Sequence, residues 1–289
     1  MNDGHTGVTS QQRTTRLDEL WPRRRPVVMA ILNCTPDSFS DGGRFLDLSA
    51  ALNHGEDLIR DGADIVDIGG ESTRPGADSV SADEELRRVL PVVSELRNRH
   101  PEMPLSVDTS KAEVAAAALE AGADLINDVA AASDHRLLDL VATHGAAIVL
   151  MHRRGRPRTM QNDTEYDDVV AEVKEFLSQR AASATEAGIP AHRVWIDPGI
   201  GFGKDVGGNL RLLAALPEFA KLGHPVLVGA SRKSFIGEIS GADVAARLPG
   251  SLAALIPTIQ LRRVVVRVHD PRPSVQFLEI ASRLVEAGA

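Results

Sequence analysis

Short apolar runs recur along the chain, and each is followed by polar or glycine-rich residues and then by a segment of helical periodicity. The runs are rich in β-branched residues and too short for helices, so they are typical of buried strands. They cover residues 27–32, 65–68, 105–107, 125–126, 147–150, 194–196, 226–228 and 264–268. The pattern therefore predicts about eight strands that alternate with helices.

The segments between the runs support helices. Residues 83–97 place apolar side chains on one face, residues 111–120 form an alanine-rich run ended by Gly122, and residues 166–186 form a third helical segment. Buried strands that alternate with helices predict a parallel sheet covered on both sides, and about eight units in about 260 residues fit a single closed (β/α)8 TIM barrel. A doubly wound open sheet is the alternative, because weak runs such as 125–126 leave the strand count uncertain by one or two.

The organisation of domains follows from the same pattern. No Pro/Ser/Gly-rich linker divides residues 26–289, which we therefore expect to form one barrel. Residues 1–25 mix acidic and basic side chains without an apolar run long enough for a secretory signal, and we expect a polar, mobile lead-in there. No stretch supplies the roughly 18 apolar residues of a membrane-spanning helix.

Composition and charge exclude several classes. The 289 residues include 24 Gly, 16 Pro and one Cys, which rules out collagen-like and disulfide-stapled proteins, and 43% hydrophobic residues argue against disorder. A net charge of −8 and 3% aromatic residues argue against nucleic acid or an anionic membrane as a partner. The single Cys34 permits no internal disulfide, as is typical of a reducing cytoplasm.

Polar residues stand directly after the apolar runs. They include Asn33 with the loop 35–43, the loop 69–76, Asp108, Asn127, His152, Asp197 with the loop 198–204, the segment 229–233, and Arg267 with His269. A polar strand end alone often just caps the next helix or turn. In a parallel barrel, however, the carboxyl ends of all strands meet at one mouth, so the whole set predicts a single pocket.

Two groups of residues suggest the chemistry of this pocket. Asp108, Asn127 and Asp197 suit a flat heterocycle with several N–H donors, because a carboxylate accepts two parallel hydrogen bonds. Two carboxylates there are equally compatible with a general acid/base pair or with metal ligands. Arg74, Lys233, Arg267 and His269 imply an anionic substrate or leaving group.

The segment 231–233 opens a predicted helix, whose free backbone N–H groups would favour an anion. The fingerprints of P-loop, nicotinamide and zinc proteins are absent from the sequence.

Eight motifs together resemble dihydropteroate synthase, the folate-pathway enzyme inhibited by sulfonamides. They are ILNCTPDSFSDGG (31–43), DIGGESTRPGA (67–77), SVDT (106–109), IND (126–128), LMH (150–152), DPGIGFGK (197–204), GASRKSFIG (229–237) and RVHD (267–270). The resemblance implies a TIM barrel and a homodimer. It also implies Mg²⁺ and the condensation of 6-hydroxymethyl-7,8-dihydropterin diphosphate with 4-aminobenzoate to 7,8-dihydropteroate and diphosphate.

The resemblance also implies roles for individual residues. Asp108, Asn127 and Asp197 would hold one edge of the pterin, and Lys233 its other side. Arg267 would stack on the ring and bind the diphosphate with His269, Asn33 would ligate Mg²⁺, and Thr73 would contact the diphosphate side. Arg74 would also bind substrate. The loops 35–43 and 72–76 would close over the site, with Phe39, Pro75, Phe202 and Ser234 beside the aminobenzoate. We expect catalysis to depend on Lys233, Arg267, His269 and Asp108.

Departures from the family pattern concentrate in the last βα unit. Arg262 and Arg263 replace a usual Gly-Ala turn, Pro271 follows Asp270, and Pro257 interrupts a helical segment, where a proline costs about 3 kcal/mol unless the helix kinks or ends. These departures leave two alternatives: a catalytically weak paralogue that binds a pterin, and a barrel that transfers methyl groups from methyltetrahydrofolate.

Overall fold

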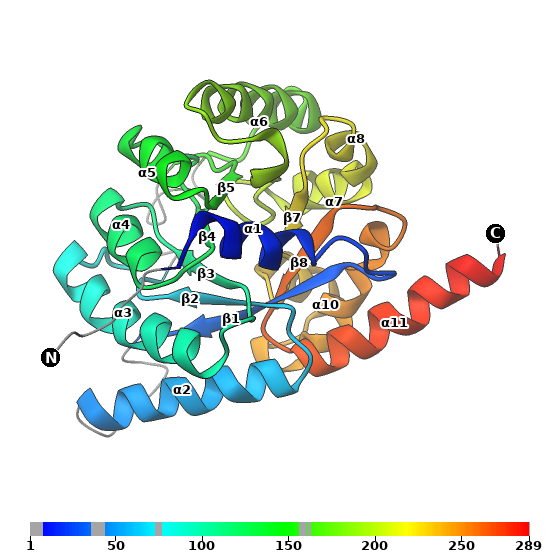
Figure 1. Cartoon of the computed structure of the whole chain (residues 1–289). Coiled ribbons are helices and arrows are strands. Elements are labelled where there is room, and N and C mark those ends of the chain that lie inside the picture. The colour runs from blue at the N-terminus through cyan, green and yellow to red at the C-terminus, as the bar shows by residue number, and fades with distance from the viewer. Residues whose placement is uncertain (1–7, 36–43, 73–76, 156–159, 161–162, 289) are drawn as a thin grey trace, which may run out of the picture.

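The computed structural model describes residues 8–35, 44–72, 77–155, 160 and 163–288, and it describes no side chains for residues 44–47. Eight parallel strands form a closed barrel in which each strand pairs with its neighbours in chain order and β8 pairs with β1 (Figure 1). The strands are β1 (Val27–Asn33), β2 (Ile65–Gly69), β3 (Leu105–Asp108), β4 (Leu125–Asp128), β5 (Ala147–Met151), β6 (Val194–Asp197), β7 (Val226–Val228) and β8 (Val264–Val268). The closed barrel confirms the TIM-barrel prediction and excludes the open sheet.

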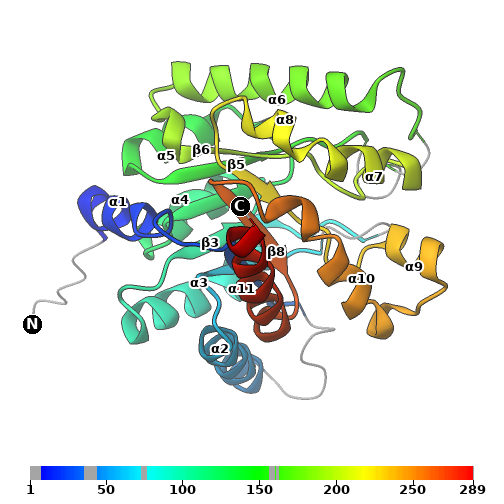
Figure 2. The same ribbon diagram turned by 90° about the vertical axis from the view of Figure 1, so that its right-hand side faces the viewer.

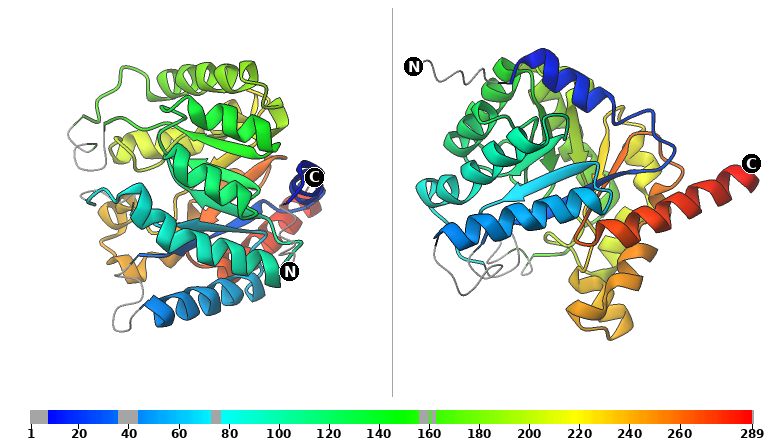
Figure 3. Two further views of the ribbon diagram at one scale, coloured as in Figure 1. Left: turned by 60° about the vertical axis from the view of Figure 1, so that its left-hand side comes forward. Right: turned by 60° about the horizontal axis from the view of Figure 1, so that its bottom comes forward.

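Helices surround the barrel (Figures 1 and 3). They are α1 (Ser10–Asp18), α2 (Arg44–Arg60), α3 (Ala82–Arg99), α4 (Ala112–Glu120), α5 (Arg136–His144), α6 (Val169–Glu186), α7 (Val206–Ala214), α8 (Leu216–Ala220), α9 (Ser234–Ser240), α10 (Leu248–Ala253) and α11 (Pro271–Gly288), with short 3-10 turns at Ala191–Arg193, Val244–Ala246 and Ile256–Thr258. The apolar side chains of the helices and the outward faces of the strands form the larger core.

The interior of the barrel is a second core. Alternate strand residues point inward, so Ile65, Leu125, Trp195 and Val265 form an apolar layer near the amino ends of their strands. Because the side-chain period of a strand is two, the residue two positions further along each strand also points inward, closer to the carboxyl end. Those four residues are polar, and they contribute to the site described below.

Helix α1 closes the amino end of the barrel, and Figure 2 shows it at the opposite end from α9. Leu17 is buried against the interior core, and the ring of Trp21 meets that of Trp195 edge to face at 5.4 Å. Arg16 donates two hydrogen bonds to the fully buried Asp124, which also accepts one from Arg97. The division of the chain at Pro26 stays a prediction, but the polar segment before it includes a helix that packs on the barrel.

The last βα unit is regular where it approaches the site. Helix α10 ends at Ala253, and Pro257 lies in a separate 3-10 turn, so no helix has a proline in its interior there. Pro271 begins α11, a position at which a missing N–H costs nothing. Strand β8 pairs in unbroken register with both neighbours, so these departures leave the strand that carries Arg267 intact.

Candidate functional site

Three buried polar side chains lie at or next to the carboxyl ends of β3, β4 and β6, at the mouth of the barrel. Asp108 ends β3, its register partner Asn127 is the penultimate residue of β4, and Asp197 ends β6. Each is at most 6% exposed. The structure therefore brings together the three residues that the sequence analysis grouped as a recognition edge.

Arg267 crosses the mouth from β8. Its Nη2 lies 2.8 Å from Asp108 Oδ2, and its Nε donates to Oδ2 of Asp67, 2.6 Å away on β2. The side chain of Asp67 is completely buried. Paired with two carboxylates, the guanidinium is held in a fixed orientation at the mouth.

Burial shifts the protonation of these carboxylates. It raises the pKa of Asp108 to about 7, with Arg267 opposing the shift and Asp67 adding to it. Burial also raises the pKa of Asp197, against the attraction of Lys233. Arg267 is the reverse case, because the attraction of Asp67 and Asp108 outweighs burial and raises its pKa. Perturbed carboxylates grouped in a strand-end pocket are typical of a functional site.

Lys233 approaches from the loop after β7. Its ammonium group donates to the carbonyl oxygen of Ile200 and lies 4.1 Å from the centre of the Phe202 ring. Burial lowers the pKa of Lys233 to about 7. Ser234, the first residue of α9, is exposed. The expected helix begins one residue after Lys233 and is only seven residues long, so backbone N–H groups give little support to an anion site there.

His269 follows β8 beside the same loop. Its Nδ1 lies 3.0 Å from Ser231 Oγ, and its backbone N–H donates to the same oxygen. The next residue, Asp270, accepts two hydrogen bonds from Arg232, whose backbone has a left-handed φ of 58°. These contacts fix the loop after β7 against the end of β8 and so place His269 and Lys233 at one mouth.

The loop after β6 is held by a buried lysine. The Nζ atom of Lys204 lies 2.9 Å from the carbonyl oxygens of Gly199 and Phe202 and 3.0 Å from Nδ1 of His152. Burial lowers the pKa of Lys204 to about 7 and that of His152 to about 3. The lysine ties this loop together and thereby places Phe202 next to Lys233.

Several expected residues receive no structural account. Thr73, Arg74, Phe39 and Pro75 lie outside the described residues, as does most of the loop 35–43.

Asn33 ends β1 and is half-buried, and its side-chain oxygen lies close to Gly69 of β2. Its position at the mouth fits a role there.

Two residues that the sequence analysis did not single out contribute to the site, namely Asp67 and Lys204. Asp67 is a charged residue inside an apolar run, as Arg267 is, and that pattern could have identified it. Lys204 gave no comparable signal, because a lysine in a glycine-rich loop is usually solvated.

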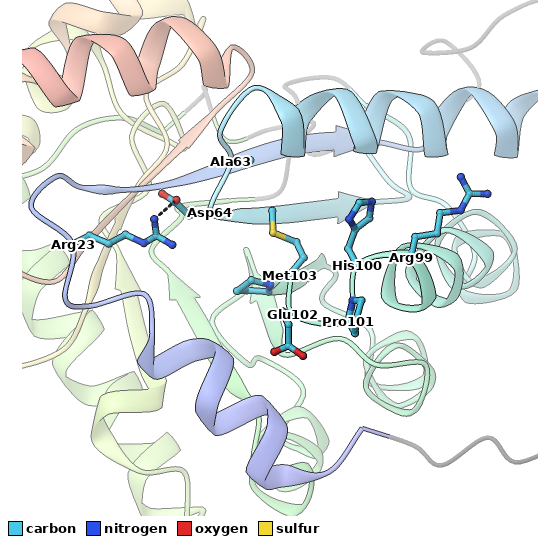
Figure 4. Close-up of a pocket in the computed structure, with 9 residues that line it drawn as sticks. Arg23, Ala63, Asp64, Arg99, His100, Pro101, Glu102 and Met103 are labelled. Carbon is cyan, nitrogen blue, oxygen red and sulfur yellow. Dashed lines mark ion pairs between the residues drawn. The ribbon is translucent and has the colours of Figure 1, made fainter.

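Other parts of the described structure do not compete with this site. A pocket of about 400 Å³ lies at the amino end of the barrel, where Arg23 pairs with Asp64 at 2.8 Å (Figure 4). It lies away from the strand carboxyl ends. Among the described residues, no group of three or more His, Cys, Asp or Glu side chains is placed so that it could hold a metal ion. The described helices include none long and apolar enough to cross a membrane.

Comparisons with known proteins agree with this geometry. A family of pterin binding enzymes matches residues 29–269. A dihydropteroate synthase from Synechocystis sp. is 46% identical over 263 residues, covering 90% of this chain and 91% of that protein.

Solved structures give the same result. The dihydropteroate synthase of Xanthomonas albilineans with 4-aminobenzoic acid superposes with a TM-score of 0.84 at 49% identity, covering 90% of this chain and 93% of that chain. A complex of a dihydropteroate synthase from the same organism with 7,8-dihydropteroate gives a TM-score of 0.81 at 46% identity, covering 90% and 94%. On this similarity and on the site at its barrel mouth, the chain belongs to the dihydropteroate synthases of the pterin binding enzyme family.

Proposed function

We propose that the protein condenses 6-hydroxymethyl-7,8-dihydropterin diphosphate with 4-aminobenzoate, releasing diphosphate and 7,8-dihydropteroate. The observation that carries the proposal is the convergence of Asp108, Asn127, Asp197, Lys233 and Arg267 on one barrel mouth. Acceptors for the donor edge of a heterocycle and cations for an anionic leaving group are thus combined in one place.

The acceptors recognise the pterin. Asp197 and Asn127 face the mouth from β6 and β4 and accept hydrogen bonds from the ring N–H and amino groups. Lys233 donates to the opposite side of the ring. Because these side chains are buried, a ligand that fails to satisfy them leaves costly unpaired polar groups, which makes recognition selective.

The cations assist the departure of diphosphate. The amine nitrogen of aminobenzoate forms a bond to the pterin methylene carbon while the C–O bond to diphosphate breaks, so negative charge accumulates on the leaving group. Arg267 and His269 stabilise that charge from fixed positions. The amine then loses its proton to solvent or diphosphate. No covalent intermediate with the protein is needed.

Asn33 fits the expected Mg²⁺. Its amide oxygen is a hard ligand at the mouth, and Mg²⁺ usually takes few protein ligands and completes its shell with water and substrate phosphates. When bound, Mg²⁺ would neutralise charge on the diphosphate. Asn33 would orient it on the side of β1.

The proposal extends to the second substrate and to the setting of the enzyme. Phe202, held by Lys204, forms an apolar wall for aminobenzoate, and sulfonamides, as its mimics, compete for that place. We include a homodimer and a cytoplasmic location, the latter supported by the single cysteine, which permits no internal disulfide. Cys34 is buried, and burial raises its pKa to about 12.

The direct test is release of diphosphate by the purified protein with Mg²⁺ and the pterin diphosphate, with and without 4-aminobenzoate. We expect release that depends on aminobenzoate. Lys233→Ala and Arg267→Ala should each lower kcat/KM by about 100-fold or more, because the first loses a charged hydrogen bond to the pterin ring and the second loses a charged group at the leaving diphosphate.

Surface variants provide matched controls. Lys174→Ala and Arg136→Ala remove the same side chains from ion pairs on helices outside the mouth and should have little effect. Normal turnover by the Lys233 and Arg267 variants would contradict the assigned roles. Binding of the pterin without turnover would instead indicate the weak paralogue.

A further inference from the structure

Asp67 is a buried carboxylate directly beneath the proposed pterin site. It points into the barrel from β2, two residues after Ile65 of the interior core, and its register partner on β3 is Ser106. One oxygen, Oδ1, accepts from Ser106 Oγ at 2.6 Å. The other, Oδ2, accepts from Arg267 Nε at 2.6 Å and from Asn127 Nδ2 at 3.1 Å.

The contact with Asn127 decides which end of that amide faces the ligand. A carboxylate paired with a guanidinium can only accept hydrogen bonds, so the atom of Asn127 that faces Asp67 must be the NH₂ group. The amide oxygen of Asn127 is then turned away from Asp67. Asn127 therefore offers an acceptor to the donor edge of a heterocycle, although an amide by itself could present either end.

The contact with Arg267 fixes the plane of the guanidinium. Its Nε bonds to Asp67 and its Nη2 bonds to Asp108, so two atoms on one edge of the plane are held by two strands. A side chain with four rotatable bonds gains a single orientation in this way. The orientation matters because a stacking arginine must present its flat face to the ring.

We propose that Asp67 is a positioning residue that sets both the amide orientation of Asn127 and the plane of Arg267, and thereby the selectivity of the site for a pterin. This inference rests on the proposed function, because it takes Asn127 and Arg267 to touch the pterin. Asp67 itself is completely buried and acts through these two residues.

The first test compares Asp67→Ala with the wild-type protein. The Ala variant leaves Asn127 and Arg267 without their shared acceptor, and we expect about 10- to 100-fold weaker binding of the pterin diphosphate by calorimetry, the scale of a hydrogen bond to a charged group. KM for the pterin diphosphate should rise in parallel, and KM for 4-aminobenzoate should stay within about twofold. If Asp67→Ala does not fold, Asp67→Ser serves instead, because its shorter polar side chain also fails to reach Arg267 and Asn127.

The conservative variant Asp67→Asn distinguishes positioning from mere packing. Its side-chain oxygen can occupy the place of Oδ2 and accept from both Arg267 and Asn127, while its NH₂ group donates to Ser106 Oγ. We expect this variant to recover most of the binding lost in Asp67→Ala. Equal losses in the two variants would overturn the proposal, as would unchanged binding in Asp67→Ala.

A matched control lies at the other end of the same strand. Asp64 is also a buried carboxylate, and it pairs with Arg25 and accepts from the backbone of Val28. Asp64→Ala should lower the thermal midpoint without weakening pterin binding. If it weakens that binding as much as Asp67→Ala does, the effect of Asp67 is a general loss of stability and the proposal is wrong.

One further variant separates this inference from the proposed function. If Asn127→Ala binds the pterin diphosphate as tightly as the wild-type protein, the assignment of Asn127 to the pterin fails, and the inference fails with it. If Asn127→Ala binds weakly while Asp67→Ala binds normally, the proposed function stands and the positioning role of Asp67 is refuted.

Discussion

Asp124→Asn tests the ion network that attaches α1 to the barrel. Asp124 is completely buried, and its Oδ1 accepts from Arg16 at 3.1 and 2.6 Å. Its Oδ2 accepts from Arg97 at 2.6 Å and from the backbone N–H of Leu105 at 3.0 Å. An asparagine amide has one oxygen, so its NH₂ group must face either one guanidinium or the other.

The size of the effect follows from this geometry. Removing the charge leaves the buried guanidiniums of Arg16 and Arg97 without a counter-ion, and breaking a buried pair from one side costs about 3–5 kcal/mol of unfolding free energy. For a chain of this length about 2 °C accompanies each kcal/mol, so the thermal midpoint should fall by about 6–10 °C. Asp124 lies at the amino end of β4, opposite the site. The KM values for the substrates, measured well below the lowered thermal midpoint, should therefore not change.

The assay is thermal and urea unfolding followed by circular dichroism, with Asp57→Asn as the control. Asp57 pairs with Arg60 on the exposed surface of α2, where such a pair contributes about 0–1 kcal/mol. A midpoint for Asp124→Asn within about 2 °C of the wild-type value would refute the reasoning. So would an equal loss in Asp57→Asn.

Three further predictions concern the site. Burial raises the pKa of Asp108 and lowers that of Lys233, both to about 7, so the affinity for the pterin diphosphate should rise with pH as Asp108 ionises and fall as Lys233 loses its proton. Lys233→Arg should remove the fall in affinity at high pH. A calorimetric pH series in which that fall persists would exclude Lys233 as its source. Lys204→Met leaves three carbonyl oxygens without their donor, including that of Phe202. It should raise KM for aminobenzoate about tenfold or more, because the Phe202 ring is no longer held in place. An unchanged KM in steady-state kinetics would show that Lys204 does not position Phe202 for aminobenzoate. Gly199→Ala should lower the free energy of unfolding in urea by about 2 kcal/mol or more, because φ at Gly199 is 69° and an added Cβ would lie 1.9 Å from the carbonyl oxygen of His152. A variant as stable as the wild-type protein would show that the loop can move aside.

The architecture of the barrel was predictable because local pattern and tertiary structure agree. The run 264–268 was expected as a strand and is β8 with the same bounds, and the weak run 125–126 extends by two polar residues, Asn127 and Asp128. Of the added residues, Asn127 faces the site, and Asp128 accepts from the backbone N–H groups of Ala130 and Ala132 in the following turn, so the apolar pattern stops at both. Hydrophobicity therefore located the strands but underestimated their carboxyl ends.

The contribution of α1 was not predictable from the same signal. Its buried side chains include Arg13 and Arg16 as well as Leu17, so the helix shows no continuous apolar stripe. Arg13 donates to the carbonyl oxygens of Leu119 and His144, in the last residues of α4 and α5. Partners that lie more than 100 residues away in the chain give no local pattern. Lys204 was missed for a different reason: its partners Gly199 and Phe202 are near in the chain, but a lysine in a glycine-rich loop is usually solvated, so its burial gave no signal.

The position of α1 has a consequence for how the chain is synthesised. Arg193 donates to Asp18, 175 residues earlier, so the helix leaves the ribosome long before its docking partners exist. At about 5–20 residues per second that interval lasts about 9–35 s. A helix with a leucine-rich face would expose an aggregation-prone apolar surface throughout this time. The guanidinium groups of Arg13 and Arg16 instead stay hydrated until Asp124 and the carboxyl ends of α4 and α5 have folded into place. The charged side chains on the buried face of α1 can thus stay hydrated in the nascent segment until its binding surface has formed.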